Sequence, residues 1–385
     1  MKIKLGLFFG GNSVEHEVSI ISALQAYGNF DKSRYDVIPI YITRENEFYT
    51  GEYTGKIEQY RDIPALLKKS VRILPTGSGD KTILRIMKGE KITKKIYDHI
   101  DLAFPVVHGT NVEDGALQGY FRTLRLPFAG CDVGASALGM DKYAQKLMYR
   151  AAGIPVREGK LFHTGQKREE ILASAAELGF PLIVKPVSLG SSIGISLASN
   201  EKELASAVDR AFEFDSAIIA ESAVPNLREI NCAVLGDRDE AEASECEEPV
   251  SGEGILSYED KYMSSGKSGK GMSGAGRLLP APVTPQQREA VRNYAIAAFK
   301  ALGCSGVARV DFLMDGKTGE IWINEINTNP GSLSFYLWEA AGMPFTRLLD
   351  ELVRLALKRE RERASLHTAV ETGILANFNG GIKAK

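Results

Sequence analysis

The first third of the chain alternates strand-like apolar runs with a helical repeat, and this alternation restricts the folds open to it. The segments "IKLGLFFGG", "YDVIPIYIT" and "DLAFPVVHG" are almost continuously apolar, whereas "VSIISALQAYGNF" carries apolar residues at helical spacing. Continuously apolar strands are typical of parallel sheets buried on both faces. The pattern predicts an open α/β sheet, which binds ligands beyond the carboxyl ends of its strands. Gly10–Ser13 and His108–Gly109 stand at two such ends.

Composition excludes several classes of protein. A chain of 385 residues is long enough for two or three domains with cores of their own. Its net charge of −2 provides no basic field for nucleic acid. No apolar run approaches the ~18 residues of a membrane span, and the short apolar run at the N-terminus reads as a strand, not a signal peptide. The four cysteines form no close-spaced pair, which argues against a zinc site or a disulfide framework. We therefore expect a cytoplasmic globular protein with no nucleic-acid or membrane partner.

Two hairpins are predicted in the rest of the chain. In "GFPLIVKPVSLGSSIGISLA" two apolar runs flank a glycine–serine loop, and in "SGVARVDFLMDGKTGEIWINEINTNPG" two strands flank an Asp–Gly–Lys–Thr–Gly turn. "SAIIAESAV" and "EINCAVLG" read as further strands, residues 263–276 as a flexible Gly/Ser/Lys loop, and "KRERERAS" as a helical charge run with a solvated face.

The last strand carries polar residues at alternate positions. Because strand side chains alternate between faces, Glu325, Asn327 and Asn329 are expected on one side, with Trp322 and Ile326 on the other. A buried carboxylate needs a partner or a metal ion.

Pairing of the last two strands would bring Asp311 beside Glu325 and Asn327, with Arg309 nearby. Such hard oxygen ligands suit Mg²⁺ that bridges phosphate oxygens. The alternative is a structural ion-pair network between Arg309 and the two acids.

The glycine–serine loop is a candidate anion site. Gly190 and Gly194 would let backbone N–H groups approach an anion beside Lys185. The alternative is an ordinary hairpin turn. Neither GxxxxGK[ST] nor GxGxxG occurs, so a bound nucleotide would not use either common cradle.

Taken together and in this order, several segments resemble the D-alanine–D-alanine ligases of the ATP-grasp superfamily and their D-Ala–D-Ser and D-Ala–D-lactate relatives. They are "FFGGNSVEHEVSIISA", "HGTNVEDGALQG", "ALGMDK", "VKPVSLGSSIG", "YEDKY", "ARVDF" and "NEINTNPG". The resemblance implies an α/β ATP-grasp fold, in which an N-terminal open α/β domain is followed by central and C-terminal α+β domains that clamp ATP. The implied boundaries are 1–140, 141–221 and 222–358, with a charged tail at 359–385.

The resemblance also implies an activity. It is the ATP-dependent joining of D-alanine to a second D-amino acid, D-alanine or D-serine, through an acyl phosphate, for peptidoglycan precursor synthesis. ATP as substrate, two Mg²⁺ or Mn²⁺ ions, a cytoplasmic location and a homodimer are implied with it. Two alternatives remain open: a ligase of the same chemistry with another acceptor, and a nucleotide-binding relative without catalysis.

Residue roles follow from the resemblance in three groups. Implied at ATP are Lys142 and Lys185 on the phosphates, Lys261 near the transferred phosphate, Glu221 and Ala223 at the adenine, and Glu229 at the ribose. The implied metal ligands are Asp311, Glu325 and Asn327. Implied in catalysis are Glu15 and His108 at the ammonium of the first D-alanine, Ser191 and Tyr262 in a network with Glu15, and Arg309 with the Gly331 N–H at the oxyanion.

The chain departs from the family pattern at several points. Val112 stands where the family has glycine, and one extra residue separates Glu221 from Glu229. After Gly331 a shorter run, "SLSFYLWEAAGMPF", replaces the Thr–Ser–His–Ser-like segment that holds the second substrate's carboxylate. Either Ser332 or Ser334 takes the place of the missing serine, or the aromatic residues line a pocket for a different acceptor.

Overall fold

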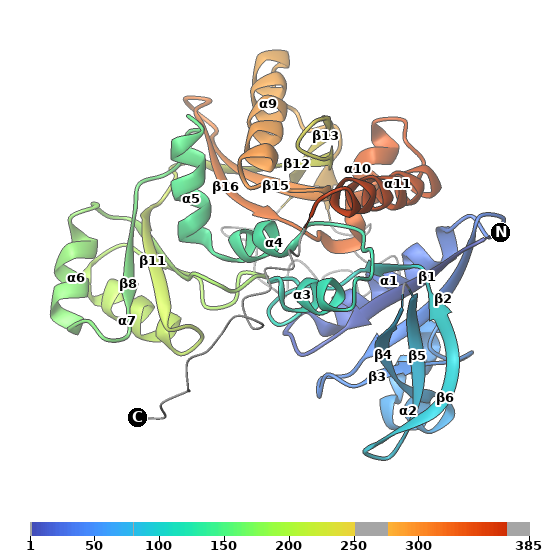
Figure 1. The fold of residues 1–385 in the computed structure, drawn as a ribbon. Helices are drawn as coiled ribbons and strands as arrows, with labels where there is room; N and C mark the ends of the chain where they lie inside the picture. Colours follow the sequence, from blue (N-terminus) through green and yellow to red (C-terminus); the bar gives the residue numbers. More distant parts are fainter. Residues whose placement is uncertain (1, 80, 251–275, 368–385) are drawn as a thin grey trace, which may run out of the picture.

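Three sheets organise the molecule, each in its own part of the chain (Figure 1). The computed structural model describes residues 2–79, 81–250 and 276–367. Tyr262, Lys261 and nearly all of the predicted 263–276 loop lie outside the described residues.

The N-terminal sheet has seven strands in the order β6-β5-β4-β3-β2-β1-β7. The strands β2, β1 and β7 run parallel, as the alternation of strand and helix predicts, whereas β3 to β6 extend the sheet in antiparallel fashion. That antiparallel extension was not predicted. The strands are β1 (Ile3–Gly10), β2 (Tyr35–Ile42), β3 (Phe48–Thr50), β4 (Val71–Ser78), β5 (Lys81–Lys88), β6 (Lys91–Ile100) and β7 (Leu102–Pro105). The helical elements are α1 (His16–Asn29), η1 (Ile57–Arg61), α2 (Ile63–Lys69), α3 (Ala116–Thr123) and α4 (Val133–Met140).

Burial on both faces explains why β1 is continuously apolar. Leu5, Leu7 and Phe9 point into one hydrophobic core, while Phe8 points into another on the opposite face. A strand of this kind has no solvated side, so it tolerates no alternation of polar residues.

The central sheet has four antiparallel strands in the order β10-β9-β11-β8. The predicted glycine–serine hairpin is confirmed, since Ser196 on β10 pairs with Val184 on β9. The elements are α5 (Lys142–Ala151), β8 (Gly159–His163), α6 (Arg168–Ala176), β9 (Leu182–Pro186), β10 (Ser196–Ala198), α7 (Glu201–Phe212) and β11 (Ala217–Ser222).

The C-terminal sheet has five antiparallel strands in the order β14-β13-β12-β15-β16. The predicted second hairpin is confirmed as β15 and β16. The elements are β12 (Leu227–Gly236), β13 (Ala241–Pro249), β14 (Arg277–Leu278), α9 (Pro285–Ala301), β15 (Gly306–Asp315), β16 (Ile321–Asn327), η3 (Gly331–Ser334), α10 (Phe335–Ala340) and α11 (Phe345–Ala364).

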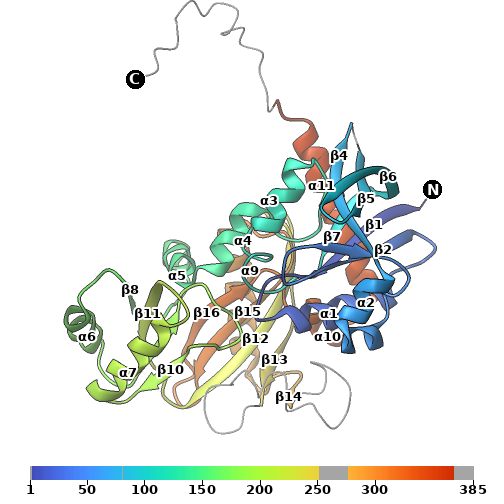
Figure 2. The ribbon, with the colours of Figure 1, turned by 90° about the horizontal axis from the view of Figure 1, so that it is seen from below.

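One hydrophobic core joins the N-terminal and C-terminal parts. It contains Leu5 and Phe104 of the first sheet together with Trp338 of α10 and Leu348 of α11. The central sheet has a separate core, drawn only from its own strands and helices. In Figure 2 the central sheet lies on one side of the C-terminal strands, and the N-terminal sheet lies on the other side.

The charge run at the end of α11 is not solvated throughout, because Arg359 is largely buried, so the prediction was wrong for this residue. Arg359 donates to the backbone oxygens of Phe128 and Gly130, and its guanidinium lies 4.4 Å from the centre of the Phe128 ring. Lys358 pairs with Asp237 at 2.7 Å. These contacts hold α11 against the segment between α3 and α4 and against the turn between β12 and β13.

The cysteines are neighbours in space although they are not neighbours in sequence. Cys232 and Cys246 are cross-strand partners on β12 and β13, and all four thiols are free. Cys131 and Cys304 share a hydrogen bond that lowers the pKa of the Cys131 thiol. Sequence spacing could not reveal these pairs because each is closed by the tertiary fold.

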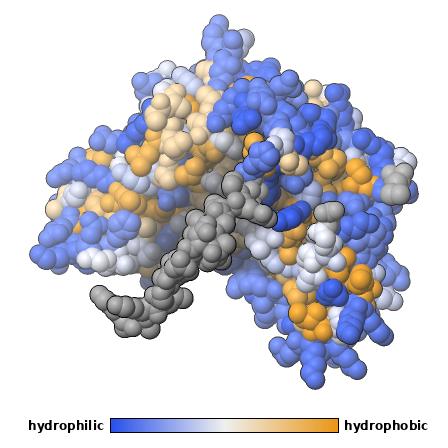
Figure 3. Space-filling model, in the orientation of Figure 1, coloured by the Kyte–Doolittle hydropathy of each residue, from blue (hydrophilic) through white to orange (hydrophobic). Residues whose placement is uncertain are grey.

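Exposed apolar side chains gather on the edge strand β6, at Ile92, Ile96 and Tyr97. The hydrophobic area at the lower right of Figure 3 lies over this part of the N-terminal sheet. Among the described helices, none is long and apolar enough to cross a membrane.

Candidate active site

Loops from the first two sheets meet at the carboxyl ends of β1 and β7. The Ser13 hydroxyl donates to the His108 carbonyl at 2.6 Å, and Glu15 directly precedes α1. From the central sheet, the loop after β9 reaches across, and the Ser191 hydroxyl donates to the Glu15 carboxylate. An added Cβ at Gly190 would lie 2.9 Å from that carboxylate, so a larger residue there would push the Glu15 side chain aside. The structure thus brings together Glu15, His108 and Ser191.

The His108 ring is held in one tautomer. Its Nδ1 donates to the Asn329 carbonyl at 2.7 Å, and its Nε2 accepts from the Ser22 hydroxyl at 3.1 Å. Ser22 in turn accepts from the backbone N–H of Ser332 at 2.9 Å. Burial lowers the pKa of His108, which keeps the ring neutral. His108 therefore links α1 to the loop that follows β16.

Glu113 is a buried carboxyl that sequence reasoning missed. It accepts hydrogen bonds from the backbone N–H groups of Gly109 and Asn329, each at 2.9 Å, and from the Thr328 hydroxyl at 3.3 Å. Burial, reinforced by the charge of Glu15, raises the pKa of Glu113 to about 8. The group fastens the loop after β7 to the loop after β16. Its only sequence signal is an acid next to Val112 in a helix-entry segment.

Val112, the departure from the family's glycine, is accommodated by another glycine. Its side chain is 2 % exposed and packs against Gly11, where an added Cβ would lie 2.4 Å from Val112 Cγ1. Gly11 therefore leaves the space that the larger side chain of Val112 fills.

A bulge rearranges the polar strand β16. Asp311 pairs with Glu325, but Phe312 pairs with Ile323, so Asn324 is an extra residue. As a result Ile323 and Ile326 both enter the same core, and Asn324 joins Glu325 on the opposite face. Strict alternation correctly placed Ile326 but misplaced Trp322, which lies under the guanidinium of Arg157 instead of in that core.

The three predicted metal-site residues and Arg309 form one connected cluster. Arg309 binds Asp311 through two hydrogen bonds of 2.7 Å, and the Asn327 amide donates to Asp311 at 3.0 Å. Lys142 pairs with Glu325 at 3.0 Å and also donates to the Leu189 carbonyl at 2.6 Å. These contacts match the ion-pair reading of the sequence, and the metal reading stays a prediction.

The donor set fits a divalent ion shared with a ligand better than an all-protein site. Within the described ranges, no three His, Cys, Asp or Glu side chains gather tightly enough to hold a metal ion. Two carboxylates and an amide oxygen leave coordination positions that Mg²⁺ usually fills with water or phosphate oxygens.

Facing this cluster is a buried group of two lysines and one acid. Glu221 on β11 lies 3.1 Å from Lys146 and 3.2 Å from Lys185, and Lys185 donates to Asn324 at 3.1 Å. Burial opposes ionisation of Glu221, but attraction from Lys185 and Lys146 outweighs it and lowers the pKa of the carboxyl. Burial lowers the pKa of Lys146. Two cations and one anion leave a surplus positive charge, which suits a phosphate group.

Lys146 and Asn324 were missed from the sequence. Lys146 stands four residues after Lys142, one helical turn along α5, so their spacing was a usable signal. Asn324 could not be found in this way because only the bulge turns it toward Lys185.

The two remaining predicted nucleotide contacts lie just after β11 and near the start of β12. The Ala223 N–H donates to the Pro181 carbonyl at 3.0 Å, and its carbonyl accepts from Arg157. Glu229 on β12 lines a pocket of about 250 Å³ together with Glu248 and Leu278.

Beyond Gly331 the chain makes an unusual left-handed turn. Ser332, Leu333 and Ser334 have φ angles of 50°, 53° and 49°. Consecutive left-handed residues cost roughly 1–2 kcal/mol each, so the surrounding contacts must impose this conformation. The turn lets the shortened segment enter α10 directly.

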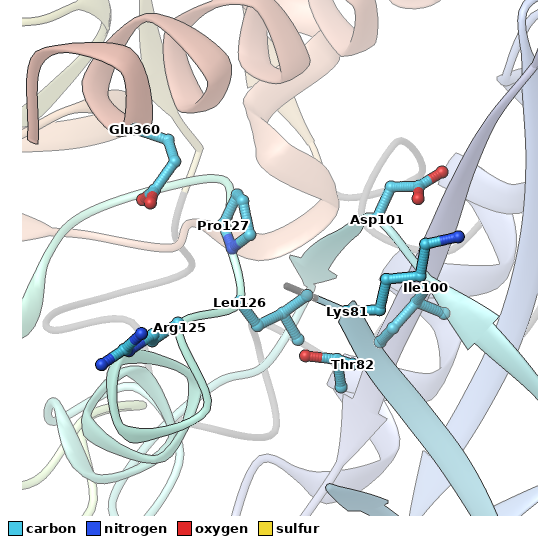
Figure 4. A pocket seen from close by; sticks show the side chains of 8 residues that line it. All are labelled: Lys81, Thr82, Ile100, Asp101, Arg125, Leu126, Pro127 and Glu360. Carbon is cyan, nitrogen blue, oxygen red and sulfur yellow. The ribbon is translucent and has the colours of Figure 1, made fainter. Parts of the chain in front are cut away.

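A larger pocket of about 340 Å³ lies elsewhere (Figure 4). Lys81, Asp101, Arg125 and Glu360 supply its charged groups. None of the predicted site residues lines it.

Fold and site together define the class of protein. A solved structure of the D-alanine–D-alanine ligase from Coxiella burnetii matches with a TM-score of 0.79 at 30% identity, covering 94% of this chain and 96% of that one. The VanG D-Ala:D-Ser ligase from Enterococcus faecalis matches with a TM-score of 0.76 at 34% identity, covering 92% and 100%. The protein has the ATP-grasp type of α/β fold.

Sequence comparisons give the family. Residues 4–131 match the model "D-ala D-ala ligase N-terminus", and residues 148–354 match "D-ala D-ala ligase C-terminus". The D-alanine–D-alanine ligase of Thermosipho melanesiensis is 36% identical, covering 97% of this chain and 98% of that protein. The D-alanine–D-alanine ligase A of Escherichia coli is 38% identical, covering 96% and 100%. The chain belongs to the D-alanine–D-alanine ligase family.

Proposed function

We propose that this protein uses ATP to join D-alanine to a second D-amino acid, D-alanine or D-serine, for peptidoglycan precursor synthesis. Its family consists of ATP-dependent ligases. Similar proteins are named D-alanine–D-alanine ligase in some cases and D-Ala:D-Ser ligase in another, so both second substrates occur among them. ATP transfers its γ-phosphoryl group to the carboxylate of the first D-alanine and leaves as ADP. The amine of the second amino acid then attacks this acyl phosphate, loses a proton and expels phosphate.

One residue, Lys142, carries the proposal. It contacts Glu325 of the carboxylate cluster and the Leu189 carbonyl of the glycine–serine loop at the same time. It therefore stands where phosphate oxygens held by that loop would meet the carboxylates.

The chain's own residues supply the remaining steps. Lys142, Lys146 and Lys185 attract the ATP phosphates, and Glu15 binds the ammonium of the donor D-alanine. Arg309 and the Gly331 N–H stabilise charge on the carbonyl oxygen when the amine attacks. The loop after β9, fastened to Glu15 through Ser191, excludes water that would hydrolyse the acyl phosphate.

Asp311, Glu325 and Asn327 are proposed to hold Mg²⁺ or Mn²⁺. When bound, such an ion neutralises charge on the transferred phosphoryl group. Such an ion would compete with Arg309 for Asp311, and a guanidinium released in this way would be available for the substrate.

Tyr262 and Lys261 are proposed to complete the network at Glu15 and at the transferred phosphate, with Glu221, Ala223 and Glu229 at the nucleoside. We further propose a cytoplasmic homodimer. The exposed apolar residues of β6 support the dimer, because an edge strand of this kind can pair with another chain.

The alternative is a ligase of the same chemistry with another acceptor. The shortened segment after Gly331 favours it, because the hydroxyl-rich run is absent. A non-catalytic relative is disfavoured because Lys142, Lys185, Arg309 and both carboxylates are all present.

The test measures phosphate release from ATP across a panel of D- and L-amino acids, with products identified by mass. We expect release that depends on D-alanine and formation of D-Ala–D-Ala or D-Ala–D-Ser. D-alanine-dependent release without either dipeptide would preserve the donor and refute the acceptor. Absence of D-alanine-dependent release would refute the proposal.

A further inference from the structure

A cluster of Glu247, Arg277 and Tyr336 lies on the same sheet as the carboxylates Asp311 and Glu325 and has no role in the proposed reaction. The Tyr336 hydroxyl donates to Glu247 at 2.8 Å, and Arg277 pairs with the other oxygen of Glu247 at 3.1 Å. The guanidinium of Arg277 also lies 4.0 Å from the centre of the Tyr336 ring. Glu247 is 4% exposed at its side chain, but Arg277 is 14% exposed. The acid is hidden, whereas the arginine and the tyrosine are both partly exposed.

The cluster lies in register with the carboxylates. Glu247 pairs with Asn231, Asn231 with Asp311, and Asp311 with Glu325, so four strands contribute one row. Cross-strand partners share a face, so this row points to the same side of the sheet. At about 5 Å between strands, Glu247 is about 10 Å from Asp311. A small amino acid bound between the two ends of this row would face Arg309, which binds Asp311, on one side and Arg277, which binds Glu247, on the other.

The serines that follow Gly331 do not offer a replacement for the family's serine. The Ser332 hydroxyl donates to Gln25 at 2.6 Å, and Ser332 is 2 % exposed. Ser334 is fully buried. The Ser334 hydroxyl has no hydrogen-bond partner among the described residues, but a neutral hydroxyl binds a carboxylate more weakly than a cationic group does, so a cation near this segment is the better partner for the acceptor's carboxylate.

Arg277 has the chemistry and the fixed orientation for that task. A guanidinium presents a planar fork that matches a carboxylate, and orientation by neighbouring groups reduces the entropy lost on binding. Glu247 pairs with one guanidinium nitrogen of Arg277, and the guanidinium lies over the Tyr336 ring. Burial raises the pKa of Tyr336, so its hydroxyl remains a donor to Glu247. We propose that Arg277, oriented by Glu247 and Tyr336, binds the α-carboxylate of the acceptor amino acid. This inference rests on the proposed function.

The inference selects a class of acceptor. It requires a small amino acid with a free α-carboxylate, and it excludes amines and amides that lack one. Tyr336 then serves to orient the arginine instead of lining a site for an uncharged acceptor.

A competition experiment tests this directly. The enzyme receives ATP, Mg²⁺ and equal concentrations of D-alanine and D-alaninamide, and the ratio of D-Ala–D-Ala to D-Ala–D-alaninamide is measured by mass spectrometry. D-Serine and D-serinamide are run in the same way. Because the ratio compares two acceptors in one reaction, it does not change with the fraction of folded enzyme.

We expect the wild type to favour the free acid strongly. Arg277→Ala should lower the ratio by about 10- to 100-fold, the range expected for a lost charged hydrogen bond. Arg277→Lys should retain part of the preference, because it keeps the charge and loses the fork. The matched control is Arg288→Ala, which removes an arginine paired with Glu245 on the same strand β13 and should leave the ratio unchanged.

An unchanged ratio in Arg277→Ala, with dipeptide still formed, would overturn the inference and leave the proposed function intact. A wild type that accepts the amide as readily as the acid would overturn it as well. If the wild type forms no dipeptide with either acceptor, the proposed function fails, and the inference falls with it.

Discussion

Asp311 on β15 and Glu325 on β16 face each other as direct cross-strand partners, immediately before the bulge that shifts the register. Two like charges side by side repel each other, and here Arg309 and Lys142 compensate them. Binding of a cation in their place would exploit the same proximity.

Removing the negative charge of Asp311 or of Glu325 should strongly lower turnover without unfolding the protein. Asp311→Asn and Glu325→Gln keep the size of each side chain but weaken the binding of Mg²⁺, whose charge stabilisation is worth several kcal/mol. We expect at least a ~100-fold loss of D-alanine-dependent ligation. Steady-state rates measure it, and thermal melting checks the fold. Glu320→Gln, an exposed acid between the same two strands, is the control and should be fully active. Near-normal activity in either site variant would refute the metal assignment.

Glu221 should be among the most important side chains for stability. Its loss leaves Lys146 and Lys185 buried together without their common counter-ion. Breaking a buried ion pair typically costs about 3–5 kcal/mol, and we expect Glu221→Ala to lower the free energy of unfolding by that amount. The control is Glu177→Ala, which removes an exposed pair with Lys160 and should cost less than about 1 kcal/mol. Urea denaturation measures both, and equal effects would contradict the prediction.

Glu113 should impose a pH dependence on stability. Its pKa is raised from 4.5 to about 8 by burial, so between these values the folded state binds more protons than the unfolded state. The free energy of unfolding should therefore fall as the pH rises toward 8. His108, with its lowered pKa, acts in the opposite direction but only below about 6.5. Melting of the wild type and Glu113→Gln between pH 6.5 and 8.5 separates the two groups. We expect the wild type to lose stability relative to the variant across this range, and parallel curves would contradict the prediction.

The left-handed turn after Gly331 can be tested by two substitutions at one position. Ser334→Ala removes the hydroxyl and keeps the Cβ, whereas Ser334→Gly removes both. Where φ is positive, glycine avoids a strain of roughly 1–2 kcal/mol, although it also increases the entropy of the unfolded chain. We therefore expect the glycine variant to melt about as high as the alanine variant or higher, the reverse of the order in ordinary helices. An alanine variant more stable by about 1 kcal/mol would mean that the turn is not left-handed in solution.

Local patterns predicted the parts of the site whose geometry depends on one hairpin or one strand end. The pairing of Asp311 with Glu325, the loop after β9, and the meeting of Ser13 with His108 follow from strand alternation and from the edge rule for parallel strands. Trp322 was misplaced because a bulge inserts one residue and turns Asn324 toward the lysines.

Contacts that depend on three elements at once were not predictable. Glu113 and the pair Arg277–Glu247 each join segments far apart in the chain. The antiparallel half of the N-terminal sheet was missed because its strands β5 and β6 are charged and partly exposed, without the apolar continuity that marked β1.

The separate core of the central sheet has a mechanical consequence. The N-terminal and C-terminal parts share apolar contacts and should move as one body. The central sheet meets them through polar contacts, such as Lys185 on β9 with Asn324 and Ser191 in the loop after β9 with Glu15. Swinging the central sheet outward about a hinge would break those contacts but expose little apolar surface. Substrates could then enter and products leave at small energetic cost. Because salt screens contacts between charged groups, the free-energy difference between the open and closed forms should decrease as ionic strength rises.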